Sequence, residues 1–168
     1  ITNFHVCTYR TSLLKQCHPL FLERMFYDDE ILYVMPLCIA KSFVYYKGVL
    51  YNYLLGREGQ TMDKNIVIRN IDFKIRIRKY EIEYVNSHPV EVPAVKDKLN
   101  YILSSRCNNT ITLISDLPYK ESRKKMKEWC SYLNCYFPGF KGGMRYELYS
   151  FLPFFGYRMI HEIYKYIK

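Results

Sequence analysis

The sequence predicts an α+β fold that is mainly helical, with a few short strands near its start. Three observations lead to this prediction. Glycine occurs three times in residues 1–62 and is absent from residues 60–138. Residues 42–55 are rich in aromatic and branched side chains that favour strands. After residue 63, apolar residues recur at helical intervals. The chain therefore divides at about residue 62.

Short elements fill the first part. The stretch "VCTYR" predicts a strand over residues 6–10, and "TSLLKQC" predicts a short helix behind Thr11 as its cap. The stretches "SFVYY" and "VLYNYLL" predict two strands, residues 42–46 and 49–55, joined by a turn at Lys47-Gly48.

Between these strands, "DDEILYVMPLCIAK" predicts a helix over residues 28–41 that is kinked or interrupted at Pro36. Asp28, Asp29 and Glu30 stand at its start. Acids in a first turn cap free backbone N–H groups, and the positive end of the helix dipole lowers their pKa. A capping acid can also point into a cleft, so capping and a functional role are both open.

The second part, residues 63–168, is expected to be helical. Residues 63–88 lack Gly and Pro and favour a helix, although their apolar residues also partly alternate and a strand competes. Further helical patterns follow Pro93 and Pro118. The stretch "NTITLIS" fits a strand or a helix equally, and a glycine-rich loop precedes the last helix.

The composition indicates a folded chain with an anionic partner. The 168 residues include 49% hydrophobic ones, which excludes wholesale disorder. The net charge of +9 favours nucleic acid, a phosphorylated ligand or a membrane surface. No run approaches the ~20 apolar residues that span a bilayer. Six scattered cysteines and four histidines lack metal-site spacing, so reduced thiols and no metal site are predicted.

Three stretches occur in a specific order: "CTYRTSLLKQ", "FYDDEILYVMP" and "LYNYLLGREGQTM". Over residues 1 to about 62 this series resembles the late, acceptor-side part of the catalytic domain of bacterial family 2 glycosyltransferases. The resemblance implies a partial GT-A segment, a helix plus short strands, followed by a helical C-terminal region in residues 63–168. It also implies that the family's nucleotide-binding half, with its Asp-x-Asp metal motif, precedes this segment.

The resemblance implies roles for particular residues. Asp29 would be the base that accepts the proton of the acceptor hydroxyl, and Asp28 would replace it if the register slips by one. Arg57 and Gln60 would bind the donor diphosphate, and His5 would contact the acceptor sugar. No cofactor is expected in this segment, since Asp28–Glu30 does not follow an apolar strand as the metal motif does; Mg²⁺ or Mn²⁺ is expected in the full-length enzyme.

The expected function is inverting transfer of a sugar from a nucleotide-sugar donor to a glycan or lipid-linked acceptor. A cytoplasmic location, peripheral at the inner face of the membrane, fits that role. The alternative is a non-enzymatic basic helical module that binds nucleic acid or a membrane. Recurrent basic and aromatic platforms are lacking, so no nucleic-acid partner is predicted.

The tail, residues 151–168, predicts an amphipathic helix. Phe155, Met159, Ile163 and Tyr166 share one face, with Arg158, Lys165 and Lys168 around it. Such a helix either packs on the preceding helices or lies on an anionic membrane surface.

Overall fold

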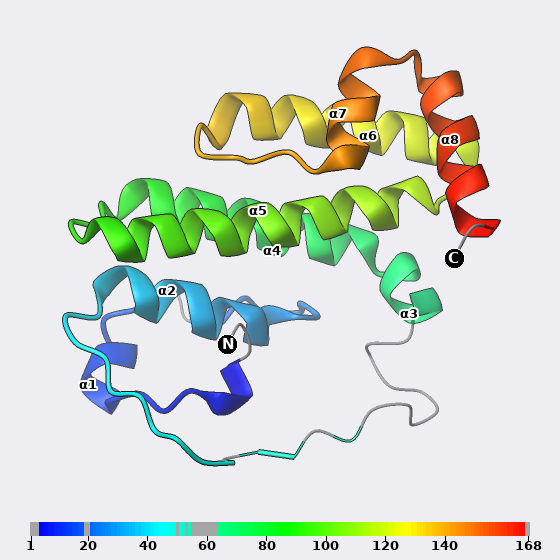
Figure 1. Ribbon diagram of the computed structural model, residues 1–168. Helices are drawn as coiled ribbons and strands as arrows, with labels where there is room; N and C mark the ends of the chain where they lie inside the picture. Colours follow the sequence, from blue (N-terminus) through cyan, green and yellow to red (C-terminus); the bar gives the residue numbers. More distant parts are fainter. Residues whose placement is uncertain (1–3, 19–20, 50, 53, 55–63, 167–168) are drawn as a thin grey trace.

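The computed structural model describes residues 4–18, 21–49, 51–52, 54 and 64–166, and the regular structure in these residues is entirely helical (Figure 1). The first part holds two 3-10 turns and two α-helices: η1 (Phe4–Val6), α1 (Thr11–Leu14), η2 (Asp28–Glu30) and α2 (Ile31–Ile39). The second part holds α3 (Lys64–Arg69), α4 (Ile71–Ser87), α5 (Pro93–Ser115), α6 (Tyr119–Tyr136), α7 (Met144–Phe151) and α8 (Phe154–Tyr166).

The prediction of an α+β fold with a partial GT-A segment is therefore wrong, because the described residues contain no strand. Residues 7–10 and 41–49 run without regular structure, and the apolar side chains of the second segment lie in solvent, with Val44 96% exposed. A lone pair of strands is marginal in water unless a third strand or a helix covers its apolar face. No helix of the described chain covers this segment.

The helical expectations for the second part are confirmed with different boundaries. The pattern over residues 63–88 breaks at Asn70 into α3 and α4. Pro93 occupies the first turn of α5, and α5 continues through "NTITLIS", which resolves that stretch as a helix. None of the helices in the described ranges is both long enough and apolar enough to cross a membrane.

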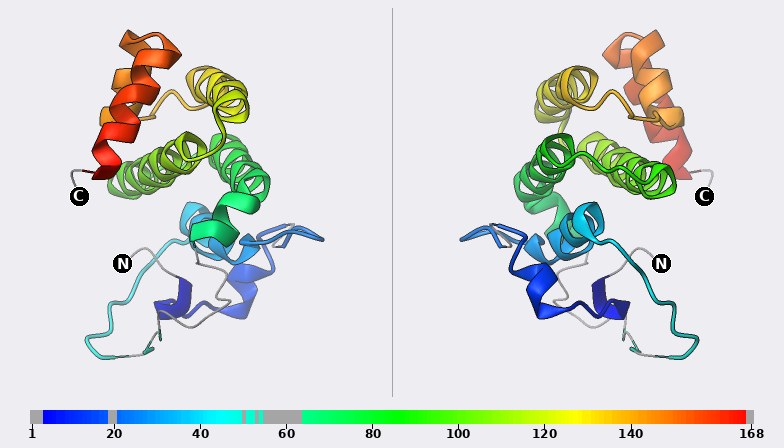
Figure 2. Two further views of the ribbon diagram at one scale, coloured as in Figure 1. Left: turned by 90° about the vertical axis from the view of Figure 1, so that its right-hand side faces the viewer. Right: turned by 90° about the vertical axis from the view of Figure 1, so that its left-hand side faces the viewer.

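Helices α4 and α5 form the central layer of the molecule. Figure 1 shows them crossing the middle, with α1 and α2 on one side and α6, α7 and α8 on the other. Figure 2 shows the same two helices nearly end-on and side by side. Helix α2 packs on both of them, so the acid-bearing segment rests on the second part of the chain.

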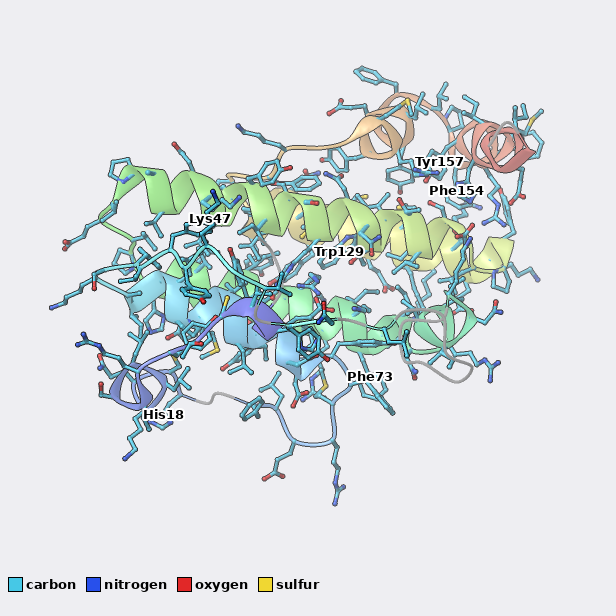
Figure 3. The ribbon with its side chains drawn as sticks, turned by 60° about the horizontal axis from the view of Figure 1, so that its bottom comes forward. His18, Lys47, Phe73, Trp129, Phe154 and Tyr157 are labelled. Carbon is cyan, nitrogen blue, oxygen red and sulfur yellow. The ribbon has the colours of Figure 1, made fainter. Side chains whose placement is uncertain are left out.

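One apolar core runs through these layers. It joins Val34 of α2 to residues of α4 and α5, to Trp129 of α6 and to Tyr157 of α8 (Figure 3). A smaller cluster beside it includes Ile31 and Met35 of α2 together with Ile77 and Tyr84 of α4. The main core thus includes residues on both sides of residue 62, and the helix carrying the acids shares its packing with α4.

Candidate functional site

The three acids follow a residue with an unusual backbone. Tyr27 has a φ of 68°, in the left-handed region that bulky residues seldom adopt. Its ring is buried, and the ammonium of Lys74 lies 3.8 Å from the ring centroid. A strained residue persists only where its surroundings over-determine it. The packing of Tyr27 under α4 therefore sets the direction in which the chain enters η2.

Glu30 points into the protein. Its carboxylate forms ion pairs with Lys74 and Arg78, which lie one turn apart on α4. Glu30 is also the N-cap residue of α2, yet its side chain makes no capping hydrogen bond. Glu30 is a first-turn acid, as the sequence predicts, and its ion pairs also fix the acid turn to α4.

Behind Glu30 lies a buried ionic network. Glu81 is 0% exposed and pairs with Arg78 on its own helix and with Arg106 of α5. Arg106 also donates a hydrogen bond to the backbone carbonyl of Glu30 at 3.3 Å. Buried charges are tolerated only when paired and hydrogen-bonded. The network therefore holds η2, α4 and α5 in one arrangement.

Asp29 is half-buried beside this network. Burial raises the pKa of its carboxyl above the ordinary value and the charge of Asp28 raises it further, while Lys74 and His5 oppose the rise. The expectation that the helix start lowers this pKa is wrong. The α-helix begins only at Ile31, after a 3-10 turn, and loss of hydration outweighs the dipole.

His5 lies close enough to Asp29 for its charge to act on that carboxylate. Its ring stacks on Tyr51 with 4.8 Å between centroids and 14° between planes. The predicted base and the predicted acceptor-binding histidine, which come from η2 and η1, are thus brought together. Tyr51 and Lys74 were missed by the sequence analysis. Lys74 carries a recognisable signal, since it interrupts the buried stripe of α4.

Asp28 faces a different space. With the loop before it, Asp28 lines an open groove of about 580 Å³. The remaining groove residues are mostly apolar, with two exposed charged ones: Phe21, Leu22, Glu23, Arg24, Met25 and Phe26. Phe26 packs edge-on against Phe73 of α4 at 5.4 Å, and Figure 3 shows Phe73 beside this loop. Asp28 therefore borders an apolar groove, whereas its neighbour Asp29 belongs to the polar cluster.

The remaining predictions concern a diphosphate-binding site and a metal site. Arg57 and Gln60, predicted to bind a diphosphate, lie outside the described residues. The acids do not fit a metal ion: Glu30 is occupied by two cations, and among the residues described no three His, Cys, Asp or Glu side chains gather as ligands. No step through a metal is derived from this chain.

Comparison with protein-family models, with curated proteins and with solved structures finds no match to this chain.

Proposed function

We propose that this chain forms the acceptor side of an inverting glycosyltransferase in which Asp29 is the general base. The observation that carries the proposal is the environment of Asp29. Its carboxylate is half-buried, has a raised pKa, sits on a turn fixed by ion pairs, and lies beside His5 and Lys74. The ordered resemblance of residues 1 to about 62 to family 2 enzymes supplies the reaction class.

The proposed reaction requires one base. The acceptor hydroxyl attacks the anomeric carbon of the donor sugar from the face opposite the nucleoside diphosphate. As the new C–O bond forms, Asp29 takes the hydroxyl proton, and the bond to the diphosphate breaks with its electron pair leaving on the phosphate oxygen. A base works best when its pKa approaches the working pH, so the raised pKa of Asp29 suits this role.

The neighbours of Asp29 would orient the reactants. Lys74 favours the ionised carboxylate, which is the form that accepts a proton. The stacked rings of His5 and Tyr51 offer a flat surface and a polar edge for a sugar. The groove beside Asp28 suits an apolar part of the acceptor, such as the start of a lipid chain. Arg57 and Gln60 keep their proposed role toward the donor diphosphate.

The test is turnover in the full-length protein that contains these residues. Asp29→Asn keeps the size of the side chain and removes the base, so turnover should fall by ~10²-fold or more while donor binding persists. Asp28→Asn is the matched control and should lose much less. Near-normal transfer by the Asp29 variant refutes the assignment; a larger loss in the Asp28 variant moves the base to the residue that faces the groove.

A further inference from the structure

Helix α8 carries apolar side chains on two opposite faces. Tyr157 is 1% exposed and His161 is 3% exposed, so one face is fully packed. Phe155 is 65% exposed, and Met159 and Ile163, one and two turns further along, are each 53% exposed. Figure 3 shows Phe154 and Tyr157 on the side of α8 that faces the other helices.

The packed face is sufficient to dock the helix. The Tyr157 hydroxyl hydrogen-bonds the hydroxyl of Ser115 at the end of α5, and His161 lies 3.1 Å from a carboxylate oxygen of Asp116. Arg158 donates to the backbone carbonyl of Leu117 at 2.9 Å. Packing on the preceding helices therefore explains Tyr157 and His161 and leaves the opposite apolar face unexplained.

Another exposed apolar residue precedes α8. Phe151, the last residue of α7, is 81% exposed, and the chain leaves the helical conformation at Leu152 and Pro153 before α8 begins. We call Phe155, Met159 and Ile163 the apolar ridge. An interfacial helix has this kind of contiguous large apolar row, with Phe and Met among its members. Scattered single apolar residues would need no explanation, but a regular row does.

Positive charge lies on α6, beside the corner from which α8 begins. Arg123 and Lys127 of α6 line an open groove of about 470 Å³ with residues of α7 and of the α7–α8 corner. Ser150 and Leu152, the sequence neighbours of Phe151, line the same groove. None of the lining residues is acidic: Arg123, Lys127, Cys130, Asn134, Tyr146, Tyr149, Ser150, Leu152 and Phe154. In the described part of the chain, no ion pair includes either cation.

These cations differ from the expected ones. Arg158 was predicted to stand at the rim of the tail, but it is turned inward, where it donates to the backbone carbonyls of Ser115 and Leu117 and pairs with Glu162 at 2.8 Å. Lys165 and Lys168 lie outside the described side chains. Among the described side chains, Arg123 and Lys127 of α6 supply positive charge beside the α7–α8 corner.

We propose that the ridge and this groove dock the protein on an anionic phospholipid bilayer. The ridge residues enter the boundary between headgroups and acyl chains, while Arg123 and Lys127 bind headgroup phosphates. Apolar insertion and basic attraction together give the reversible binding of a peripheral protein. The proposal does not depend on sugar transfer, because it rests on residues remote from Asp29.

Sedimentation with vesicles tests it on the whole chain. Vesicles of phosphatidylcholine alone are compared with vesicles that also contain phosphatidylglycerol. The wild-type protein should sediment with the anionic vesicles and be released by added salt. Arg123→Gln with Lys127→Gln should weaken this binding about 25-fold, since each basic residue near an anionic surface contributes about fivefold. Lys96→Gln, at an exposed lysine of α5, is the control and should bind nearly as the wild type does.

The ridge is tested with Phe155→Ser, Met159→Ser and Ile163→Ser combined, and with Phe155→Ser alone in case the triple variant misfolds. Both should lose vesicle binding, whereas Tyr101→Ser, at an exposed aromatic of α5, should keep it. Binding by the ridge variants equal to that of the wild type overturns the proposal, as does no binding by any form. A dimer in light scattering that the ridge variants convert to a monomer overturns it too, because the ridge would then join two copies.

Discussion

Three adjacent acids at the start of α2 have three different environments. Glu30 is paired with two cations of α4, Asp28 borders an apolar groove, and Asp29 is half-buried within the electrostatic influence of Lys74 and His5. Chemically similar carboxylates acquire different roles when their surroundings push their proton affinities apart. The sequence identifies Asp29 as the proposed base only through a resemblance. The structure adds a physical reason, because partial burial makes the ionised form of its carboxyl less favourable than in water.

The unfavourable ionisation of Asp29 should lower the stability of the folded protein at neutral pH. The pKa of Asp29 is raised in the folded state, so its contribution to stability is full below the unfolded pKa of ~3.9 and is lost as the pH rises through the folded value. Asp29→Asn should therefore be more stable than the wild type at pH 7, and the difference should vanish in acid. Thermal melts at pH 4 and pH 7 measure this. Asp72→Asn, at an exposed acid of α4, should show no such gain; an unchanged or lower midpoint for Asp29→Asn contradicts the account.

Helix α4 is the element on which the site depends. One of its faces carries Lys74, Arg78 and Glu81 among apolar residues, and all three are buried. The strand alternative for this stretch fails because Glu81 would then point to the opposite side from Lys74 and Arg78, and the Arg78–Glu81 ion pair could not form. Helical periodicity predicted the element but not the burial of these three charges.

Because of the buried ionic network, a single substitution of Glu81 should strongly lower the free energy of unfolding. Glu81→Gln keeps the volume of the side chain and leaves the buried Arg78 without its full charge partner. Removing one partner of a buried ion pair costs about 3–5 kcal/mol of folding free energy. Urea unfolding should show a loss of that order, while Glu83→Gln, at an exposed acid of the same helix, should change stability by less than ~0.5 kcal/mol. Equal midpoints for the two variants contradict a structural role for the network.

The strand predictions failed because propensity alone does not decide which element forms. Aromatic and branched residues in residues 42–55 have high strand propensity, but propensity measures fit to a half-buried pleated surface. The described part of this segment has no such surface against it. In contrast, "NTITLIS" has strand-forming residues yet is helical, because Ile111 and Ile114 are buried in the core at helical spacing. Packing decided both outcomes.

At the scale of the whole molecule, the two predicted parts of the chain share one core. Val34 on α2 and the residues of α4, α5 and α6 belong to the same cluster, and Glu30 pairs with two cations of α4. The proximity of His5, Asp29 and Lys74 could not be predicted from the sequence, because it arises from the packing of η1, η2 and α4 rather than from local spacing. The position of the three acids at a helix start could be predicted, since they stand together directly before an apolar helical run.

The shared core predicts that the acid segment does not fold alone. A peptide of residues 1–62 lacks α4, so α2 keeps its apolar face in water and Glu30 has no counterion. Helices this short are marginal without tertiary packing. Circular dichroism of the peptide should show little helix, and adding residues 63–168 in trans should restore some of it. A stably helical isolated peptide would mean that the acid turn is independent of α4.

The pH dependence of kcat/KM in the full-length protein tests the central claim, that Asp29 is a base whose proton affinity is set by its surroundings. The acidic limb of that profile reports the pKa of the base in the free enzyme. It should lie above the ~3.9 of an ordinary aspartate. Lys74→Met removes the charge that most lowers the pKa of Asp29 and leaves Glu30 its partner Arg78, so the limb should move to higher pH. Lys125→Met, whose lysine pairs with the exposed Asp72, should leave the limb in place. A limb at the ordinary value that is the same in all three proteins would contradict the assignment.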